Sequence, residues 1–237
     1  MWPETISQEQ WSVYQRVIAA SHAAGLQFAV GGGFAVGHYT GLWRESKDMD
    51  LYVLRQDAPI LQNILTEAGL VDYFDQLPYD RAWIYRAIKD KVIVDIIWAM
   101  ANHKNDVDQR WIACGPEITL GGETVRFVPP EEMIWAKLYV LQRDRSDWPD
   151  ALNMISAQRR NLNWRHLLDR LRDDAPLLFA LLTVFRWMCP NLAQDLPAWL
   201  WREVDKQDDS KSSSPEIWRQ RADLLDRRCW FGPVLST

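Results

Sequence analysis

A glycine run followed by two alternating aspartates constrains this chain more than any other feature. Residues 30–54 read VGGGFAVGHYTGLWRESKDMDLYVL. Apolar residues 26–30 predict a short strand that enters the glycines, and residues 34–40 predict a short helix after them. A basic loop follows, and residues 49–54 predict a second strand. The order is therefore strand, glycine run, helix, basic loop, strand.

The glycines are candidates for holding phosphate. Gly32 and Gly33 lie between the predicted strand and the predicted helix. Glycines let the backbone approach a ligand closely, and amides at a helix N-terminus face an anion. A glycine run alone is weak support, so its position before the paired aspartates is what makes it informative.

The two aspartates share one face of the second predicted strand. Neighbouring side chains in a strand point to opposite faces. Asp48 and Asp50 therefore project to one side, whereas Met49 and Leu51 project to the other and are expected to be buried. Two carboxylates on one face are typical of a metal site, although a D-x-D pair is often only a solvated strand end.

A third aspartate lies inside an apolar segment further along the chain. Asp95 is flanked by Val94 and Ile96 in the run VIVDIIW. A charge inside a buried strand is costly unless a metal or a partner compensates it. Asp95 is therefore either a third metal ligand or a buried salt-bridged residue, with Lys91 or Arg86 as the partner.

Three carboxylates from two strands suit a pair of magnesium ions. Mg²⁺ prefers oxygen ligands, and two such ions about 4 Å apart stabilise the attacking and leaving oxygens of phosphoryl transfer. The pattern predicts that Asp48, Asp50 and Asp95 bind two Mg²⁺ ions and act in catalysis.

Composition restricts the class of protein without identifying it. The chain has 237 residues, a net charge of −5, 48% hydrophobic and 25% charged residues, as in an ordinary globular protein. The negative charge argues against nonspecific coating of nucleic acid. Cys114, Cys189 and Cys229 lack metal-ligand spacing. The apolar stretch of residues 176–189 is too short to span a bilayer. We therefore expect a cytoplasmic protein without a membrane segment.

The remaining pattern predicts a mixed α/β domain over residues 1–128 and a helical domain over residues 129–237. Two hairpins are expected, the first around a Lys89-Asp90 turn and the second around Gly121-Gly122. No element is assigned to residues 102–114. The strands of the hairpins are 82–88 with 91–98 and 118–120 with 124–128; helices are predicted at 7–24, 58–68, 131–143, 148–159, 164–172, 177–188, 197–204 and 215–228, with a linker at 205–214.

The first block resembles the signature of the DNA polymerase β-type nucleotidyltransferase superfamily, GG-x-A followed by R-x-S-K-D-x-D-L. The resemblance implies an α+β nucleotidyltransferase fold, with a mixed β-sheet flanked by helices and then a C-terminal helical domain. It implies transfer of a nucleotide from an NTP, with ATP favoured, and a role for Asp95 in deprotonating the acceptor hydroxyl. The matching positions are Gly32, Gly33, Ala35, Arg44, Ser46, Lys47, Asp48, Asp50 and Leu51.

A second block resembles the bacterial branch that includes small antibiotic nucleotidyltransferases and type IV toxin–antitoxin toxins. The block begins PPEEMIWAKLYVLQRDRSDWPDALNMI at residue 129. By this resemblance Lys137 reaches the nucleotide phosphates. The first resemblance implies that Gly32 and Gly33 hold the triphosphate, with Arg44 or Lys47 near it, and Ser46 is counted with them. The resemblance places Arg143, Asp147 and Asp150 along the cleft, while the plainer interpretation of the two aspartates is helix N-terminal charge.

Two classes of function remain open. The first is an active enzyme whose acceptor is a small molecule, an RNA end or a protein; the negative net charge slightly favours a small molecule. Four arginines of the helical half form either a basic wall for RNA or a solvated face. The second class is a catalytically silent nucleotide-binding or protein-interaction module. A toxin of a toxin–antitoxin pair is a further alternative, and the oligomeric state is not predicted. The four arginines are Arg143, Arg145, Arg159 and Arg160.

Overall fold

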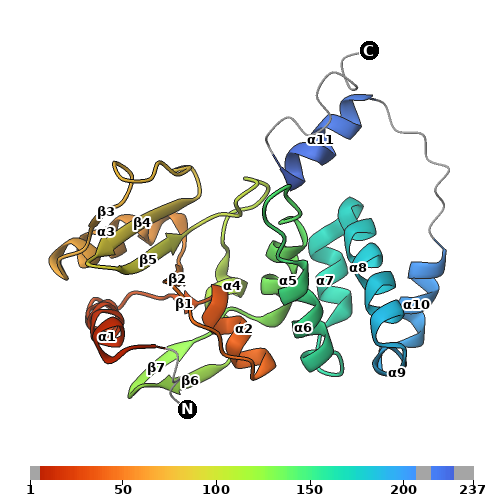
Figure 1. Ribbon diagram of the computed structural model, residues 1–237, viewed down its shortest axis with the longest axis horizontal. Coiled ribbons are helices and arrows are strands. Elements are labelled where there is room, and N and C mark those ends of the chain that lie inside the picture. The colour runs from red at the N-terminus through yellow and green to blue at the C-terminus, as the bar shows by residue number, and fades with distance from the viewer. Residues whose placement is uncertain (1–5, 207–214, 227–237) are drawn as a thin grey trace. The chain divides into compact units, whose positions relative to one another are not determined.

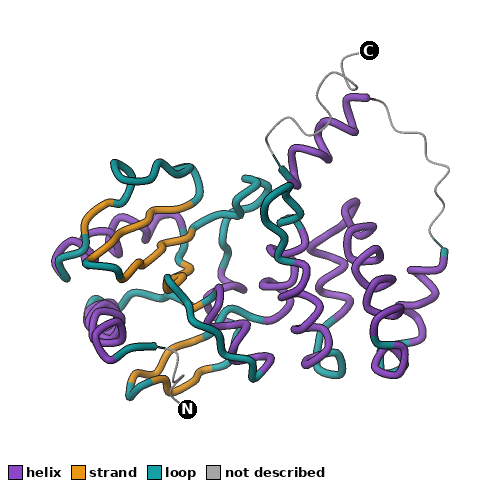
Figure 2. Tube along the Cα trace, viewed as in Figure 1, coloured by secondary structure: helices purple, strands orange, loops and turns teal. Residues whose placement is uncertain are grey.

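The computed structural model describes residues 6–206 and 215–226, and it divides the chain into two compact units. The units are Met1–Met133 and Ile134–Thr237. Figure 2 shows that the described strands all belong to the first unit, whereas the described part of the second unit is helical. The predicted domain boundary after residue 128 stays a prediction.

A mixed five-stranded sheet forms the centre of the first unit (Figure 1). Its strand order is β1-β2-β5-β4-β3, and β2 and β5 are parallel while the other neighbours are antiparallel. The predicted mixed sheet flanked by helices is confirmed. The strands are β1 (Ala29–Val30), β2 (Asp48–Tyr52), β3 (Val71–Asp72), β4 (Ile84–Lys89) and β5 (Val92–Ile97).

One face of the β2–β5 pair is apolar and fully buried. Met49 opposes Val94 and Leu51 opposes Ile96, and all four side chains are inaccessible to solvent. Burying side chains of this size contributes about 1.5–3 kcal/mol each. The predicted burial of Met49 and Leu51 is confirmed, and the aspartates of both strands necessarily project to the other face.

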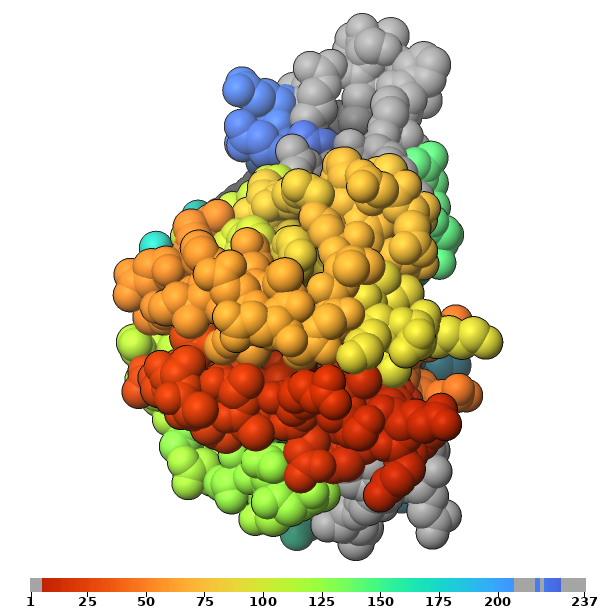
Figure 3. All heavy atoms as spheres, turned by 90° about the vertical axis from the view of Figure 1, so that its left-hand side faces the viewer, coloured from red at the N-terminus to blue at the C-terminus, as the bar shows by residue number. Residues whose placement is uncertain are grey.

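Helices α1 (Gln8–Ala23) and α3 (Ala58–Glu67) pack on each other and on β5. Ser7 caps the N-terminus of α1, because its side chain accepts a hydrogen bond from the Gln10 amide at 3.1 Å. Figure 3 shows α1 between α3 and a separate two-stranded hairpin. That hairpin pairs β6 (Glu117–Leu120) with β7 (Glu123–Arg126) through Gly121 and Gly122, both at positive φ as the turn requires.

The second unit consists of helices in its described residues. A helix, α5 (Pro130–Leu138), begins in the first unit and ends in the second. The buried residues of α7, Trp164, Leu167 and Leu171, follow helical spacing and explain why this segment packs. The helices are α6 (Trp148–Gln158), α7 (Trp164–Leu171), α8 (Ala175–Met188), α9 (Pro190–Ala193), α10 (Ala198–Asp205) and α11 (Pro215–Leu225). None of the helices in the described ranges is long and apolar enough to cross a membrane.

The structure corrects several predicted bounds. Strand β1 has only two residues, and α2 (Gly32–Thr40) begins at the glycines rather than after them. Helix α5 ends at Leu138, five residues earlier than predicted, because the chain folds back there: the Asp147 amide donates to the Val140 carbonyl at 2.9 Å.

Among the strands and α-helices, three short ones were not predicted, and one turn is displaced. The unpredicted elements are β3, α4 (Gln109–Ala113) and α9. The predicted Lys89-Asp90 turn is wrong by one residue, because Lys89 pairs with Val92 and leaves Asp90, at φ 55°, and Lys91 in the turn. Cys229, residues 207–214 of the predicted linker and the predicted helical residues 227–228 lie outside the described residues.

Candidate active site

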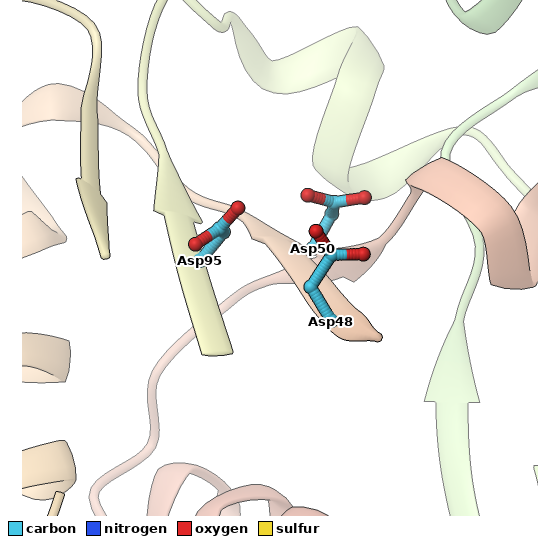
Figure 4. A group of neighbouring side chains, drawn as sticks. All are labelled: Asp48, Asp50 and Asp95. Atoms are coloured by element: carbon cyan, nitrogen blue, oxygen red, sulfur yellow. The ribbon is translucent and has the colours of Figure 1, made fainter. Parts of the chain in front are cut away.

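The register of one strand pair brings the three predicted carboxylates together. Asp50 on β2 lies directly opposite Asp95 on β5, and Asp48 lies two residues before Asp50 on the same face. Each of the three side chains offers an oxygen within 4.8 Å of the others. Figure 4 shows Asp48 and Asp50 rising from one strand and Asp95 from its neighbour.

The three carboxylates differ in their access to solvent. The Asp95 side chain is 1% exposed, whereas the Asp48 side chain is 34% exposed. Burial raises the pKa of Asp95, the neighbouring charge of Asp48 raises it further, and Arg86 acts in the opposite direction. The site is thus a negatively charged group with one buried and two partly open members.

Arg86 on β4 is a member of this group that the sequence did not identify as a site residue. It is the register partner of Asp95 and donates from Nε to Oδ1 at 2.7 Å and from Nη2 to Oδ2 at 2.5 Å. The same Nη2 lies 3.6 Å from Oδ2 of Asp48. The hydrogen bond to Asp95 raises the pKa of Arg86 above its ordinary value. The two interpretations of Asp95 are therefore compatible, because this residue is salt-bridged and also belongs to the acidic group.

The glycines lie against Asp50. The Gly31 amide donates to the Asp50 carbonyl at 2.9 Å. Gly32 is the first residue of α2 and has φ +52°, and a Cβ there would lie 1.5 Å from Oδ2 of Asp50. A Cβ on Gly33 would lie 3.0 Å from Oγ of Ser46. The N-terminus of α2 and the acidic group are therefore immediate neighbours, and phosphate binding by Gly32 and Gly33 stays a prediction.

A chain of hydrogen bonds ties helix α1 to the loop before β2. Ser46 donates from Oγ to the Asp48 carbonyl at 2.9 Å. The Gln10 side chain donates from Nε2 to the Ser46 carbonyl at 2.9 Å and to the Tyr14 hydroxyl at 2.8 Å. Tyr14 is fully buried, and burial raises its pKa above the ordinary value. No sequence pattern indicated the contact of Gln10 with Ser46, because it joins residues 36 positions apart.

The two predicted cations of the loop, Arg44 and Lys47, are exposed. Their exposure fits a role in ligand binding and equally fits a solvated surface. Their role beside a triphosphate therefore stays a prediction.

Lys137 is buried within the second unit, with two acidic neighbours. Its side chain is 9% exposed, and Nζ lies 3.0 Å from Oδ2 of Asp147 and 2.9 Å from Oδ2 of Asp150. Asp147 occupies the N-cap position of α6 and Asp150 its first turn. Paired charges of this kind satisfy a buried ammonium, and the prediction that Lys137 reaches nucleotide phosphates stays open.

The donor chemistry of the acidic group fits a hard divalent cation. Asp48, Asp50 and Asp95 offer only oxygen, which is the donor that Mg²⁺ prefers. Within residues 6–206 and 215–226 no other group of three potential ligands of this kind occurs. These three residues could hold a metal ion.

The geometry agrees with the family to which the sequence is similar. A family model described as "Nucleotidyl transferase of unknown function (DUF2204)" matches residues 11–174, well over half of the chain. The chain belongs to this family. The match includes the glycine run, the three carboxylates and Lys137, and the predicted enzyme class, a nucleotidyltransferase, is confirmed. No curated protein matches the chain.

Several solved structures are similar to this family member. The antibiotic-resistance factor ANT(2'')-Ia matches with 20% identity over 80% of this chain and 97% of its own, at a TM-score of 0.47. The lincosamide antibiotic adenylyltransferase LnuA matches with 15% identity over 64% of this chain and 98% of its own, at 0.46. JHP933 from Helicobacter pylori matches with 13% identity over 93% of this chain and 90% of its own, at 0.40.

Proposed function

We propose that this nucleotidyltransferase is metal-dependent and transfers the NMP group of an NTP, with ATP favoured, to an acceptor hydroxyl or phosphate. The observation that supports this proposal most strongly is the meeting of three carboxylates within 4.8 Å on one face of a parallel strand pair. The bond between the α- and β-phosphates breaks, a bond from the acceptor oxygen to the α-phosphorus forms, and pyrophosphate leaves.

The chain's own residues have separate roles in this proposal. Asp48 and Asp50 hold two Mg²⁺ ions, and Asp95 completes the site and takes the proton of an acceptor hydroxyl. When bound, the metal ions supply charge neutralisation for the triphosphate and the developing negative charge. The amides of Gly32 and Gly33, at the start of α2, bind triphosphate oxygens.

Three polar side chains of the first unit complete the proposed phosphate site. Ser46 is held beside Asp48, and Arg44 and Lys47 carry exposed positive charge. The proposed role of Lys137 is binding of nucleotide phosphate, and for this its ammonium must be shared with or released from its carboxylate partners, 2.9 and 3.0 Å away.

A small molecule is the proposed acceptor. The net charge of −5 disfavours a large polyanion. The arginines considered as an RNA wall have acidic neighbours: Arg145 contacts Asp147, and Arg159 and Arg160 both contact Asp195. Arginines neutralised in this way contribute less to a positive surface. Cys114 and Cys189 are free thiols, which suits the proposed cytoplasmic location.

The proposal is tested by transfer of label from each [α-³²P]NTP, with Mg²⁺, to pooled metabolites, to RNA and to protein. The fractions are separated by acid precipitation and by gel. Magnesium-dependent formation of a new labelled acid-soluble compound, distinct from the NTP and accompanied by stoichiometric pyrophosphate, supports a small-molecule acceptor. Label on RNA or protein overturns that acceptor, and would fit a toxin. NTP binding by calorimetry without pyrophosphate release on any acceptor identifies a silent binding module instead.

A further inference from the structure

We propose that the guanidinium of Arg86 occupies a metal position in the metal-free protein and must leave it before a divalent cation binds. Arg86 then sets the cation concentration at which the site fills. The inference rests on the proposed metal dependence, and it assigns to Arg86 a role beyond holding the sheet together.

The position of one nitrogen supports this proposal. Nη2 of Arg86 lies 2.5 Å from Oδ2 of Asp95 and 3.6 Å from Oδ2 of Asp48. These are two of the three carboxylates that could share a metal ion. A cation bridging Asp48 and Asp95 would need oxygens of both residues, and this nitrogen already contacts an oxygen of Asp95 and lies near an oxygen of Asp48. The guanidinium and a bridging cation therefore exclude each other.

Charge compensation explains why an arginine is held there. Asp95 is almost completely buried, and two further carboxylates lie beside it. Without a cation this arrangement would leave a buried charge unpaired, which is strongly unfavourable. The two-pronged hydrogen bond from Arg86 supplies one positive charge in fixed geometry. Arg86 thus stabilises the empty site.

The exposure of Arg86 makes an exchange feasible. Its side chain is 25% exposed, whereas that of Asp95 is 1% exposed. An arginine on a flexible stem can move its charge into water, whereas the buried carboxylate on the central strand cannot follow. A divalent cation brings twice the charge to the same oxygens, so it can replace the guanidinium at sufficient concentration.

The alternative role for Arg86 predicts the opposite effect of its removal. If Arg86 only orients Asp95 as a ligand, its loss disorders the ligand and weakens metal binding. If Arg86 competes with the metal, its loss removes a positive charge from the metal position. Metal affinity should then rise by about tenfold or more, because unit charges a few ångström apart interact strongly at a partly buried site.

The test compares Mn²⁺ binding, without nucleotide, by the full-length protein and its Arg86→Met variant. Free Mn²⁺ is measured by electron paramagnetic resonance, and apo and loaded samples are checked by circular dichroism. Arg81→Met is the matched control, because Arg81 forms a 2.5 Å pair with Asp72 in the same sheet. We expect about tenfold or tighter binding for Arg86→Met and an unchanged constant for Arg81→Met. Unchanged or weaker binding by Arg86→Met overturns the inference.

A second measurement covers the case in which Arg86→Met does not fold. The Nε–H of Arg86 in the unmodified protein, assigned by its absence in Arg86→Lys, is followed by nuclear magnetic resonance during titration with Mg²⁺. Release from Asp95 should move this resonance to the position of a solvated arginine as the site fills. A resonance that stays at its hydrogen-bonded position at saturating Mg²⁺ overturns the exchange.

The Asp50→Asn variant separates this inference from the proposed function. One outcome is that the unmodified protein and Arg86→Met bind Mn²⁺ with equal affinity, whereas Asp50→Asn does not bind it. In that case the proposed metal site is supported and the proposed role of Arg86 is wrong. If no variant shows binding that depends on Asp50, the proposed metal dependence fails and the inference fails with it.

Discussion

Asp50 and Asp95 lie directly opposite each other on the only parallel pair among the described strands of the sheet. Register partners in a parallel pair present their side chains on the same face. A shift of one residue would turn one carboxylate into the apolar core and separate it from the other. The acidic group therefore depends on how β2 aligns with β5. The position of the Asp50 carboxylate also depends on its neighbour Gly32, which leaves room for it.

Gly32→Ala should damage the site more than the fold. The left-handed φ of Gly32 disfavours alanine by about 1–2 kcal/mol. The new Cβ would also lie 1.5 Å from Oδ2 of Asp50. The carboxylate can rotate away, so the unfolding free energy should fall only by this amount, while Mn²⁺ binding should weaken by about tenfold or more because a ligand is displaced.

Gly41→Ala is the matched control for that substitution. Gly41 also has a positive φ, +73°, but a Cβ there would meet no atom within 4 Å. Its loss of stability, measured by denaturant unfolding, should be similar, and Mn²⁺ binding should not change. Equal Mn²⁺ affinities for the Gly32 and Gly41 variants would show that a side chain placed against Asp50 does not affect metal binding.

Gln10→Ala should slow nucleotidyl transfer although Gln10 contacts no reacting group. The substitution removes hydrogen bonds to the Ser46 carbonyl and the Tyr14 hydroxyl. We expect about 1–2 kcal/mol lower stability, from the net value of two such bonds, and a lower kcat because the loop before Asp48 loosens.

Gln15→Ala provides the comparison on the same helix. Gln15 is half-buried like Gln10, and its side chain bonds to Glu123 at 3.0 Å, away from the loop. Steady-state kinetics should show a normal kcat for this variant despite some loss of stability. A similar fall of kcat in both variants would assign the effect to general destabilisation of α1.

The contribution of Asp147 to stability should depend on pH in the acid range. Burial acts to raise its pKa, but Lys137 and Arg145 outweigh burial, and the pKa lies below the ordinary 3.8. A lowered folded pKa means that stability is present above the unfolded value and is lost as pH falls through the folded value. The difference in unfolding free energy between the unmodified protein and Asp147→Asn should be full above about pH 5 and should shrink below 3.8.

Lys137→Met shows whether this dependence arises from the ion pair. Without the ammonium, the effect of Asp147→Asn on the unfolding free energy should vary less across the acid range. Chemical unfolding at several pH values measures how Asp147→Asn changes the unfolding free energy, both in the unmodified protein and in the Lys137→Met variant. An effect of Asp147→Asn that is constant from neutral pH to well below the ordinary aspartate pKa would contradict a lowered pKa at Asp147.

The three carboxylates could be identified as site candidates because the signals that mark them lie in short stretches of sequence. The two-residue period of a strand places Asp48 and Asp50 on one face, and the apolar neighbours of Asp95 reveal an unusual buried charge. That these residues meet was inferred from the metal chemistry they suit and from the resemblance, because the parallel pairing of β2 with β5 joins segments far apart in the chain and no local pattern predicts it.

The sequence left Lys91 and Arg86 as alternative partners of Asp95, and an error of one residue in a turn prevented a choice between them. A Lys89-Asp90 turn would place Arg86 opposite Ile93, whereas the observed pairing of Lys89 with Val92 places it opposite Asp95. The signal was present in the sequence, because a residue at positive φ is needed in such a turn and Asp90 tolerates it better than Lys89.

The central claim is tested most directly by label transfer from [α-³²P]ATP with Mg²⁺, using Asp50→Asn, Asp95→Asn and the exposed control Asp75→Asn. Circular dichroism and unfolding curves confirm that each variant is folded. We predict that Asp75→Asn transfers label at the normal rate, and that the two site variants are slower by about a hundredfold or more, because each loses a ligand of the metal site. Full activity in folded Asp50→Asn and Asp95→Asn, or transfer that persists in excess chelator, would contradict the account.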